Sequence, residues 1–524
     1  MIKFDQINFS ICIKPNIAVL ISYIFTLLMA HIFFQDNFKL QFILLNLILF
    51  HYLAYELLNF YIKGKKLFIV QPYFLVIAAF FILLHLMPNL RLFFVDPTEV
   101  LPARMVFWSD DPYRPLIKTM YLLNLSAVAI FLGYKNQAMK FIGEKIRKKF
   151  NNISTTSLRP SLSLPYPLIF LIIAIGIVSV VLQISWGIFG YGVSDQLLAE
   201  YASYTQWFSY IAKAQLLLIL ILAYMIYGHE SPPTSLKIIF ILLLIFLISQ
   251  GFFAASKGQA IFPIFAAFIG SYLATGKIYL RLLMMGAIVL VLAFIIIEPY
   301  RALKNIYPDA EFFEAIALLQ QVPDELTEQV AEDDITFLDK MGEMSVWFLG
   351  RQDNFSFSAN AIEFKDRYGI PDNNTPDFLG SVIYSPAFAY IPRFIWKSKP
   401  IDQIGAWYED SIMQSPNYSA SAFGAIGYAY YVGGILGVFF IFFFFGLMQR
   451  LVAEIFLQMN SLPGFCIYLG LILPITSINS ELGGVITGFL RSVPVVIMGV
   501  FIIFYNYKNI FSLKSLKSLK SLKP

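Results

Sequence analysis

The sequence predicts an all-helical protein that crosses a membrane many times, and three observations lead to that fold class. Of the 524 residues, 58% are hydrophobic and only 14% are charged, whereas soluble domains average about 25% charged residues. The mean hydropathy is +0.69. Twelve separate apolar runs approach the length of about 20 residues that a helix needs to cross the hydrocarbon core. A soluble globular protein, a disordered chain and a disulfide scaffold are therefore excluded.

The apolar runs are the predicted membrane-spanning helices. Run 40–61 contains His51 and Glu56, and run 463–478 is short and contains Pro474, so these two are the least regular of the twelve. The first run is too long for a cleavable signal peptide, and no small-residue cleavage site follows it. The twelve runs are 17–34, 40–61, 67–87, 115–134, 165–187, 207–228, 236–254, 259–276, 278–297, 422–446, 463–478 and 483–505.

Lysine and arginine in the short loops set the predicted orientation. With a cytoplasmic N-terminus, the basic clusters at 63–66 and 135–159 and the basic C-terminal tail all lie on the cytoplasmic side. The tail repeats Ser-Leu-Lys four times, from Ser512 to Lys523. These repeats either hold the tail on anionic lipid, at about 1 kcal/mol per lysine, or form a frayed end that only reinforces the orientation.

Charge is distributed unevenly and marks off one external segment. Residues 298–421 hold 20 of the 33 acidic residues but only 9 of the 38 basic residues. A structureless connection of this length is uncommon, so the segment is expected to have its own structure or function. The predicted parts are thus spans one to nine in 1–297, the external segment 298–421, spans ten to twelve in 422–505 and a basic cytoplasmic tail at 506–524.

Within the external segment, residues 335–366 have the pattern of a helix that ends at the following Gly-Ile-Pro sequence. Arg351 lies on a mainly apolar face of this predicted helix. Two interpretations remain open: Arg351 snorkels or pairs with Glu343 or Asp353, or it faces a cavity that holds an anion. The residues of that face recur at spacings of three and four: Met344, Phe348, Arg351, Phe355, Ser358 and Ile362.

A second apolar stretch of the segment, 378–400, contains Pro386 and Pro392 and is therefore unsuited to a complete span. We expect a broken or re-entrant helix, an element found where backbone lines a cavity in the membrane. The stretch ends with basic residues that include Arg393 and Lys399. Arginine matches phosphate with a planar fork of donors, and lysine acts as a point charge. This basic end is suited to bind a lipid-linked phosphate.

Three further cations lie at or near the predicted outer boundary. Lys257 lies between the seventh and eighth spans, Arg301 at the outer end of the ninth, and Arg491 inside the last span. An arginine within the membrane is costly and is a functional-site hypothesis by default. The structural alternative for Arg491 is an ion pair with Glu481.

Four short motifs are similar in type and order to those of a known family. They are Ala255-Ser-Lys257-Gly-Gln, Pro299-Tyr-Arg301, Leu349-Gly-Arg351-Gln-Asp-Asn and Ile391-Pro-Arg393-Phe-Ile-Trp-Lys-Ser-Lys399-Pro400. Together they resemble the O-antigen, or oligosaccharide repeat-unit, polymerases of the Wzy type, over roughly residues 250–450. Some members carry an arginine, ten residues and then a glycine in two external loops. Here eleven residues separate Arg393 from Gly405, and Arg351 has no glycine at that distance.

The resemblance implies a multi-pass glycosyltransferase of the bacterial inner membrane with a GT-C-like fold. Its outward, periplasmic site would join repeat units carried on undecaprenyl diphosphate into a surface polysaccharide. Cationic groups stabilise a diphosphate leaving group, and a carboxylate acts as general base on the acceptor hydroxyl. The candidate diphosphate-binding residues are Arg351, Arg393, Arg301, Lys257, Lys399 and Arg491. The candidate bases are Asp353, Glu343, Glu409 and Asp410.

No cofactor or metal is expected. A lipid-linked diphosphate already carries the activation, so no nucleotide is required, and the sequence contains no Asp-x-Asp metal signature. The four histidines are scattered without a metal-binding spacing. Besides the lipid-linked oligosaccharide and membrane lipid, the family implies a chain-length regulator and a flippase as partners, and no nucleic acid.

Two alternative functions stay open. An O-antigen ligase is expected to rely on an external histidine, for which only the span-end residues His31 and His85 are candidates. A polysaccharide transporter or flippase would be expected to show internal repeats. None is visible, and the insertion 298–421 breaks a division into six plus six spans.

Overall fold

The computed structural model describes residues 17–62, 68–100, 111–151, 166–191, 193, 197, 201–306, 354–370, 375–391, 395–396, 404–413, 424–459, 461–476, 478 and 482–500. Over these residues the chain is helical, with short turns and without strands. The predicted all-helical class is confirmed.

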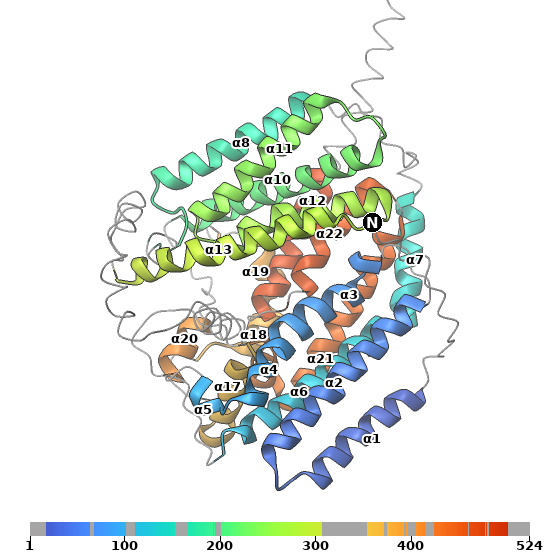
Figure 1. Cartoon of the computed structure of the whole chain (residues 1–524), viewed down its shortest axis with the longest axis vertical. Coiled ribbons are helices and arrows are strands. Elements are labelled where there is room, and N and C mark those ends of the chain that lie inside the picture. Colours follow the sequence, from blue (N-terminus) through green and yellow to red (C-terminus); the bar gives the residue numbers. More distant parts are fainter. Residues whose placement is uncertain are drawn as a thin grey trace, which may run out of the picture.

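A first group of helices comes from the N-terminal part of the chain, and most of it occupies the lower half of Figure 1. Its third predicted span, extended to residue 94, is one continuous helical path, in which the π-helix η3 links α3 to α4. The elements of this group are α1 (Ile17–Phe33), α2 (Phe38–Ile62), η2 (Phe68–Val70), α3 (Pro72–Val76), η3 (Ile77–Leu86), α4 (Met87–Phe94), α5 (Pro97–Val100), α6 (Tyr113–Tyr134) and α7 (Gln137–Asn151).

A second group, drawn in green shades in the upper half of Figure 1, packs as a layer in which α10 and α12 share the broadest contact. Helix α12 begins at a serine cap and ends at Gly276, whose φ of +67° closes the last turn. The elements are α8 (Tyr166–Ser185), α10 (Ala202–Gly228), α11 (Thr234–Phe253), α12 (Lys257–Thr275) and α13 (Leu280–Ile306).

The remaining helices join and cap these groups. Helix α21 packs along α6, and α22 contacts α21, α3 and α10, so it bridges the two groups. Helices α17, α18 and α20 lie at the left end of the array in Figure 1, and α7 lies at the right. The elements are α17 (Asn354–Tyr368), α18 (Phe378–Ile383), α19 (Ser385–Tyr390), α20 (Ile404–Ser411), α21 (Ala425–Ile455), η4 (Leu457–Met459), α22 (Leu462–Thr476) and the last helix, Leu482–Val500.

Two glycines allow α6 and α21 to approach closely. A Cβ atom on Gly133 would lie 3.0 Å from the amide nitrogen of Leu447 and 3.1 Å from the Cα of Gly446, and closer still to the carbonyl oxygen of Phe443. Small residues at helix interfaces permit such close packing in membranes, where the hydrophobic effect does not drive helices together. This contact joins the N-terminal group to α21.

Helix α21 is broken within its length. Gly433 has φ of −163° and ψ of 29°, and Gly434 has φ of +61° and ψ of −144°, so neither residue is helical. Gly434 adopts a conformation that L residues rarely reach. The predicted span 422–446 is therefore two helical segments in sequence, and the second extends to Ile455.

Length and surface both fit a membrane. Among the described residues, nine helices are long and apolar enough to cross one. The other three predicted runs contain shorter apolar helices, at Val19–Phe33, Leu280–Ala293 and Leu462–Ile472. Large apolar side chains point outward along whole helices; on α11, for example, Leu242 is 62% exposed. In water such continuous apolar faces would be unfavourable, whereas hydrocarbon accommodates them.

Candidate functional site

The turn between α11 and α12 is where two of the predicted motifs meet. Ser256 caps α12 by accepting a hydrogen bond from the backbone N–H of Gln259 at 3.4 Å. Ala255 precedes it with φ of +49°, an uncommon backbone conformation for a residue with a side chain. Its carbonyl oxygen accepts two hydrogen bonds from Arg301, from Nε at 2.9 Å and from Nη2 at 2.7 Å. Arg301, on the last turns of α13, is thereby fixed beside the residue pair that precedes Lys257.

A third segment completes this constellation. The guanidinium of Arg301 lies over the ring of Tyr191, 4.7 Å from its centroid, a distance typical of a cation–π contact. Gly190 precedes Tyr191 with φ of +91°, a backbone conformation that favours glycine. We call this constellation the Lys257–Arg301 site: Tyr191, Ala255, Ser256, Lys257 and Arg301.

The Lys257–Arg301 site combines several sources of positive potential. Lys257 is partly exposed at the first position of α12, where the positive end of the helix dipole favours anions. Arg301 adds a second positive charge beside it, held in place by the bonds from its Nε and Nη2 to the carbonyl of Ala255. The arrangement is suited to an anion such as a phosphate or diphosphate.

Helices α17, α18 and α20 form a compact unit on the first turns of α21. The ring of Phe378 lies 5.3 Å from that of Trp407, 5.4 Å from that of Tyr428 and 5.0 Å from that of Tyr431. Tyr408 donates a hydrogen bond to the carbonyl of Phe357 at 3.2 Å. This aromatic packing is well suited to hold α17, α18 and α20 as one body.

The apolar face predicted for the helix 335–366 is buried where it is described, in α17. Phe355, Ser358 and Ile362 are each 0% exposed, and α17 packs against η3, α6 and α21. The helix ends at Tyr368 and Gly369 follows with φ of +77°, which agrees with the predicted stop.

A charged cluster fastens the end of α17 to the two neighbouring helices. Lys118 of α6 forms an ion pair with Asp366 and donates a hydrogen bond to the hydroxyl of Tyr430 at 2.8 Å. The Tyr430 hydroxyl in turn donates to Asp366 at 2.7 Å. We call these residues, with Lys365, the Lys118–Asp366 cluster.

Lys365 caps the broken helix. Its Nζ donates hydrogen bonds to the carbonyl oxygens of Tyr430, at 2.8 Å, and Tyr431, at 3.2 Å. These carbonyls belong to the turn before the break at Gly433–Gly434, where the regular helical pattern stops. Burial lowers the pKa of Lys365, and the neighbouring Asp366 acts in the opposite direction.

Arg491 holds the broken segment that was predicted from its prolines. That segment consists of α18 and α19, separated at Tyr384. Arg491 of the last helix donates hydrogen bonds to the carbonyls of Phe388, at 2.6 Å, and Ala389, at 3.3 Å, at the end of α19. Arg491 is thereby placed against backbone rather than in open space, and Glu481 lies outside the described residues.

For the other predicted site residues, the structure describes no side-chain contacts. Glu343, Arg351, Asp353, Arg393 and Lys399 lie outside the described residues. Glu409 and Asp410 follow Tyr408 on α20, and only their backbone is described. The structure thus brings Lys257 and Arg301 together and places Arg491 at α19, while the remaining residues stay predictions.

Sequence reasoning missed several charged residues inside helices. Lys118 lies within predicted span 115–134 and Lys213 within 207–228, where Lys213 donates a hydrogen bond to the Ser492 hydroxyl at 3.1 Å. A charge inside an apolar run is itself the signal that identifies such residues. Lys365 had no local signal, because its partners lie 65 and 66 positions away.

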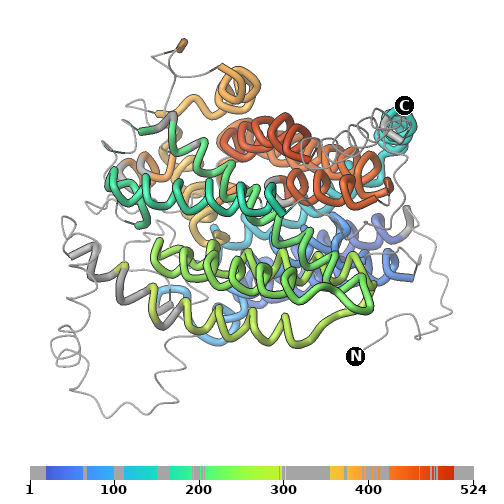
Figure 2. Tube along the Cα trace, turned by 90° about the horizontal axis from the view of Figure 1, so that it is seen from above, coloured from blue at the N-terminus to red at the C-terminus, as the bar shows by residue number. Residues whose placement is uncertain are grey.

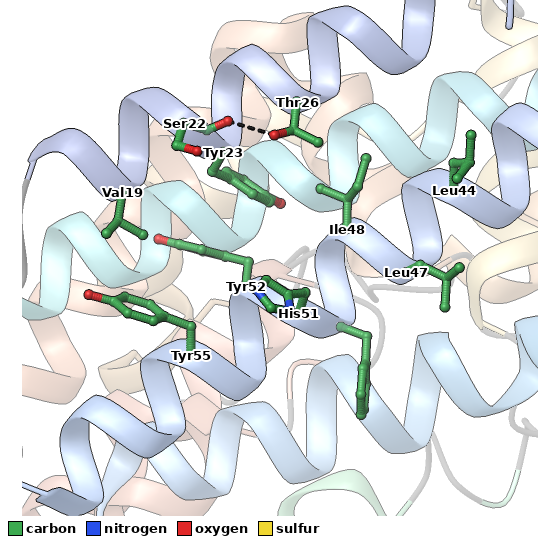
Figure 3. Close-up of a pocket in the computed structure, with 11 residues that line it drawn as sticks. Val19, Ser22, Tyr23, Thr26, Leu44, Leu47, Ile48, His51, Tyr52 and Tyr55 are labelled. Atoms are coloured by element: carbon green, nitrogen blue, oxygen red, sulfur yellow. Dashed lines mark hydrogen bonds between the residues drawn. The ribbon is translucent and has the colours of Figure 1, made fainter. Parts of the chain in front are cut away.

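A groove between α1 and α2 has a volume of about 700 Å³. Figure 3 shows aromatic side chains, including Tyr23, Tyr52 and Tyr55, on its walls. Beside it, the buried carboxylate of Glu56 accepts hydrogen bonds from Lys135 at 2.6 Å and from Tyr73 at 3.0 Å. That pairing explains how the irregular span 40–61 tolerates an acidic residue. The groove belongs to α1 and α2 and contains no residue of the Lys257–Arg301 site.

Among the residues that the structure describes, no group of three or more His, Cys, Asp or Glu side chains is arranged to hold a metal ion. No family model, curated protein or solved structure matches this chain significantly. The fold and surface define the class: a helical multi-pass membrane protein. Within that class, the Lys257–Arg301 site is the constellation best suited to bind an anion.

Proposed function

We propose that this protein is a glycosyltransferase that polymerises oligosaccharide repeat units carried on undecaprenyl diphosphate. It would act at the periplasmic face of the bacterial inner membrane, with both termini in the cytoplasm, and it would contribute to an O-antigen or a related surface polysaccharide. The proposal rests first on the resemblance to the Wzy-type polymerases. The structure supplies one observation that supports it independently of that resemblance.

The supporting observation is the meeting of two motifs at the Lys257–Arg301 site. Lys257 and Arg301 are 44 positions apart in the sequence, and the Arg301–Ala255 hydrogen bonds of 2.9 and 2.7 Å bring their segments together. A diphosphate carries its charge on oxygens that accept several donors at once. Arginine and lysine side chains gathered near a helix N-terminus suit that charge.

In the proposed reaction, the growing chain leaves its lipid diphosphate and is transferred to a hydroxyl at the non-reducing end of the next lipid-linked unit. The bond between the sugar and the diphosphate breaks as the new glycosidic bond forms, and undecaprenyl diphosphate leaves. Arg301, Arg351 and Arg393 would stabilise the developing charge, assisted by Lys257 and Lys399. The proton of the attacking hydroxyl would pass to one of the carboxylates Glu343, Asp353, Glu409 or Asp410.

The hydrogen bonds of Arg491 suggest a positioning role within this scheme. They hold the end of α19, from which the chain continues toward Arg393. By fixing the backbone that precedes Arg393, the guanidinium of Arg491 would set the position of Arg393. We therefore assign Arg491 to orientation of the basic segment rather than to direct binding.

A flippase remains a second candidate because of the broken helix α21. Transporters often use discontinuous membrane helices whose freed carbonyls line a substrate path. In this chain Lys365 donates hydrogen bonds to two of the carbonyls next to the break. This pairing favours a fixed bend in α21 over an open substrate path. An O-antigen ligase has weaker support: His85 is 0% exposed and its Nδ1 lies 2.7 Å from the carbonyl of Phe80.

The test compares substitutions at the two ends of α12 and α13, in cells that depend on this protein for a surface polysaccharide. Lys257→Ala and Arg301→Ala should collapse the polysaccharide ladder toward single repeat units, because they remove cations from the proposed diphosphate site. Lys277→Ala and Arg281→Ala are matched controls, since Lys277 follows the far end of α12 and Arg281 lies in the first turn of α13. Membrane levels of all four variants would be measured by immunoblot.

Normal ladders in both Lys257→Ala and Arg301→Ala, at wild-type protein levels, would contradict the assignment of this site. A loss of all surface polysaccharide, including single units, with lipid-linked units accumulating inside the cell would favour the flippase instead.

A further inference from the structure

Helix α7 differs from the other long helices in direction. It crosses the right-hand ends of its neighbours in Figure 1, and Figure 2 shows it nearly end-on while α8, α12 and α21 lie across the view. A helix that runs across the ends of membrane spans lies along the membrane surface rather than through it.

One side of α7 is anchored to α21. Gly143 is buried against Glu454, where a Cβ atom would lie 2.7 Å from the Cβ of Glu454. Arg147 lies 3.2 Å from one carboxylate oxygen of Glu454, and Arg450 lies 3.1 Å from the other. These contacts fix the rotation of α7 about its own axis, and therefore which residues it turns outward.

The outward side combines apolar and basic residues. Phe141 is 68% exposed and Ile142 is 40% exposed. Lys145, Lys148 and Lys149 are exposed on the next turns, and among the described residues no carboxylate pairs with any of the three. An exposed phenylalanine is unfavourable in water, and three neighbouring lysines repel one another unless an anionic surface faces them.

We propose that α7 is an interfacial helix that binds anionic phospholipid. Phe141 and Ile142 enter the boundary between headgroups and acyl chains, and Lys145, Lys148 and Lys149 contact lipid phosphates. Three observations favour this occupant over a protein partner: the helix belongs to a membrane protein, it crosses the ends of the spans, and its charge is complementary to anionic headgroups. The proposal is independent of the enzymatic function.

The experiment measures lipid at α7 directly, in the full-length chain in nanodiscs. The probe is a bimane fluorophore on Phe141→Cys in a Cys12→Ser background, since the other cysteine, Cys466, is 0% exposed. Quenching is compared between nitroxide-labelled phosphatidylglycerol and nitroxide-labelled phosphatidylcholine. Phosphatidylglycerol should quench at the lower mole fraction, with a preference of about fivefold for each contributing lysine.

The preference should disappear in Lys145→Gln/Lys148→Gln/Lys149→Gln. It should persist in Lys63→Gln/Lys65→Gln/Lys66→Gln, which removes the same charge from another basic stretch of the sequence. If the two lipids quench equally when all three lysines of α7 are present, the proposal is overturned. It is also overturned if the preference for phosphatidylglycerol survives the triple substitution in α7. Absence of quenching by either lipid would also overturn it and would point to a protein partner. Size-exclusion profiles verify that each variant is folded.

Discussion

At the residue scale, three cations share one arrangement: each donates to carbonyls at the end of a helical segment. Arg301 binds the carbonyl of Ala255 just after α11, Lys365 binds those of Tyr430 and Tyr431 before the break in α21, and Arg491 binds those at the end of α19. The last carbonyls of a helix lack intrahelical partners and carry its partial negative charge. These three partly buried cations are thereby stabilised by the backbone.

Lys365→Met tests whether a cation that donates to helix-end carbonyls stabilises the protein. The substitution keeps much of the side-chain length but leaves the carbonyls of Tyr430 and Tyr431 without their donor. Hydrogen bonds that involve a charged group contribute roughly 1.5–3 kcal/mol, so we expect a clearly lower thermal unfolding temperature in detergent. Lys237→Met, at an exposed lysine of α11, is the control. Equal unfolding temperatures for the two variants would show that Lys365 does not stabilise the break.

At the element scale, apolar run length predicted helices well and predicted their interruptions less well. Run 115–134 corresponds to α6 and run 236–254 to α11, nearly residue for residue. The prolines predicted a broken stretch at 378–400, which contains α18 and α19. Sequence reasoning missed the break in α21, because two glycines inside an apolar run are also compatible with a straight helix.

The Lys257–Arg301 site illustrates the same limit. The types of Lys257 and Arg301, and their places at the ends of apolar runs, could be read from the sequence. Their meeting at the carbonyl of Ala255, and the cation–π contact with Tyr191, depend on the packing of α12 against α13. Contacts between distant segments have no local signature, so the sequence predicted the residues but could not predict the constellation.

Close packing of α6 against α21 gives an element-scale prediction. Gly133→Ala should lower stability by about 1–3 kcal/mol, the usual effect of overpacking, because the added Cβ would meet backbone atoms of Phe443, Gly446 and Leu447. Gly488→Ala is the matched control on the last helix, where a Cβ atom would have no neighbour within 4 Å among the described residues. Thermal unfolding in detergent measures both. If Gly133→Ala is as stable as the control, α6 and α21 do not approach as described.

At the scale of the whole molecule, the two kinds of charged region lie at opposite ends of the helical array. Helices α17, α18 and α20, from the acidic segment 298–421, lie at one end, and the basic helix α7 lies at the other. The orientation predicted from the loops assigns the two regions to different sides of the membrane, and that assignment stays a prediction. In the proposed function, substrate binds at the first end and α7 rests on the opposite membrane surface.

The most direct test of the proposed function uses the purified full-length protein in nanodiscs with undecaprenyl-diphosphate-linked repeat units. We predict that the protein alone converts them into a ladder of longer lipid-linked chains and releases undecaprenyl diphosphate. Arg351→Ala and Arg393→Ala should reduce both products together by at least tenfold, as expected for lost stabilisation of the leaving group. A purified, folded protein that leaves the repeat units unchanged would contradict the central claim.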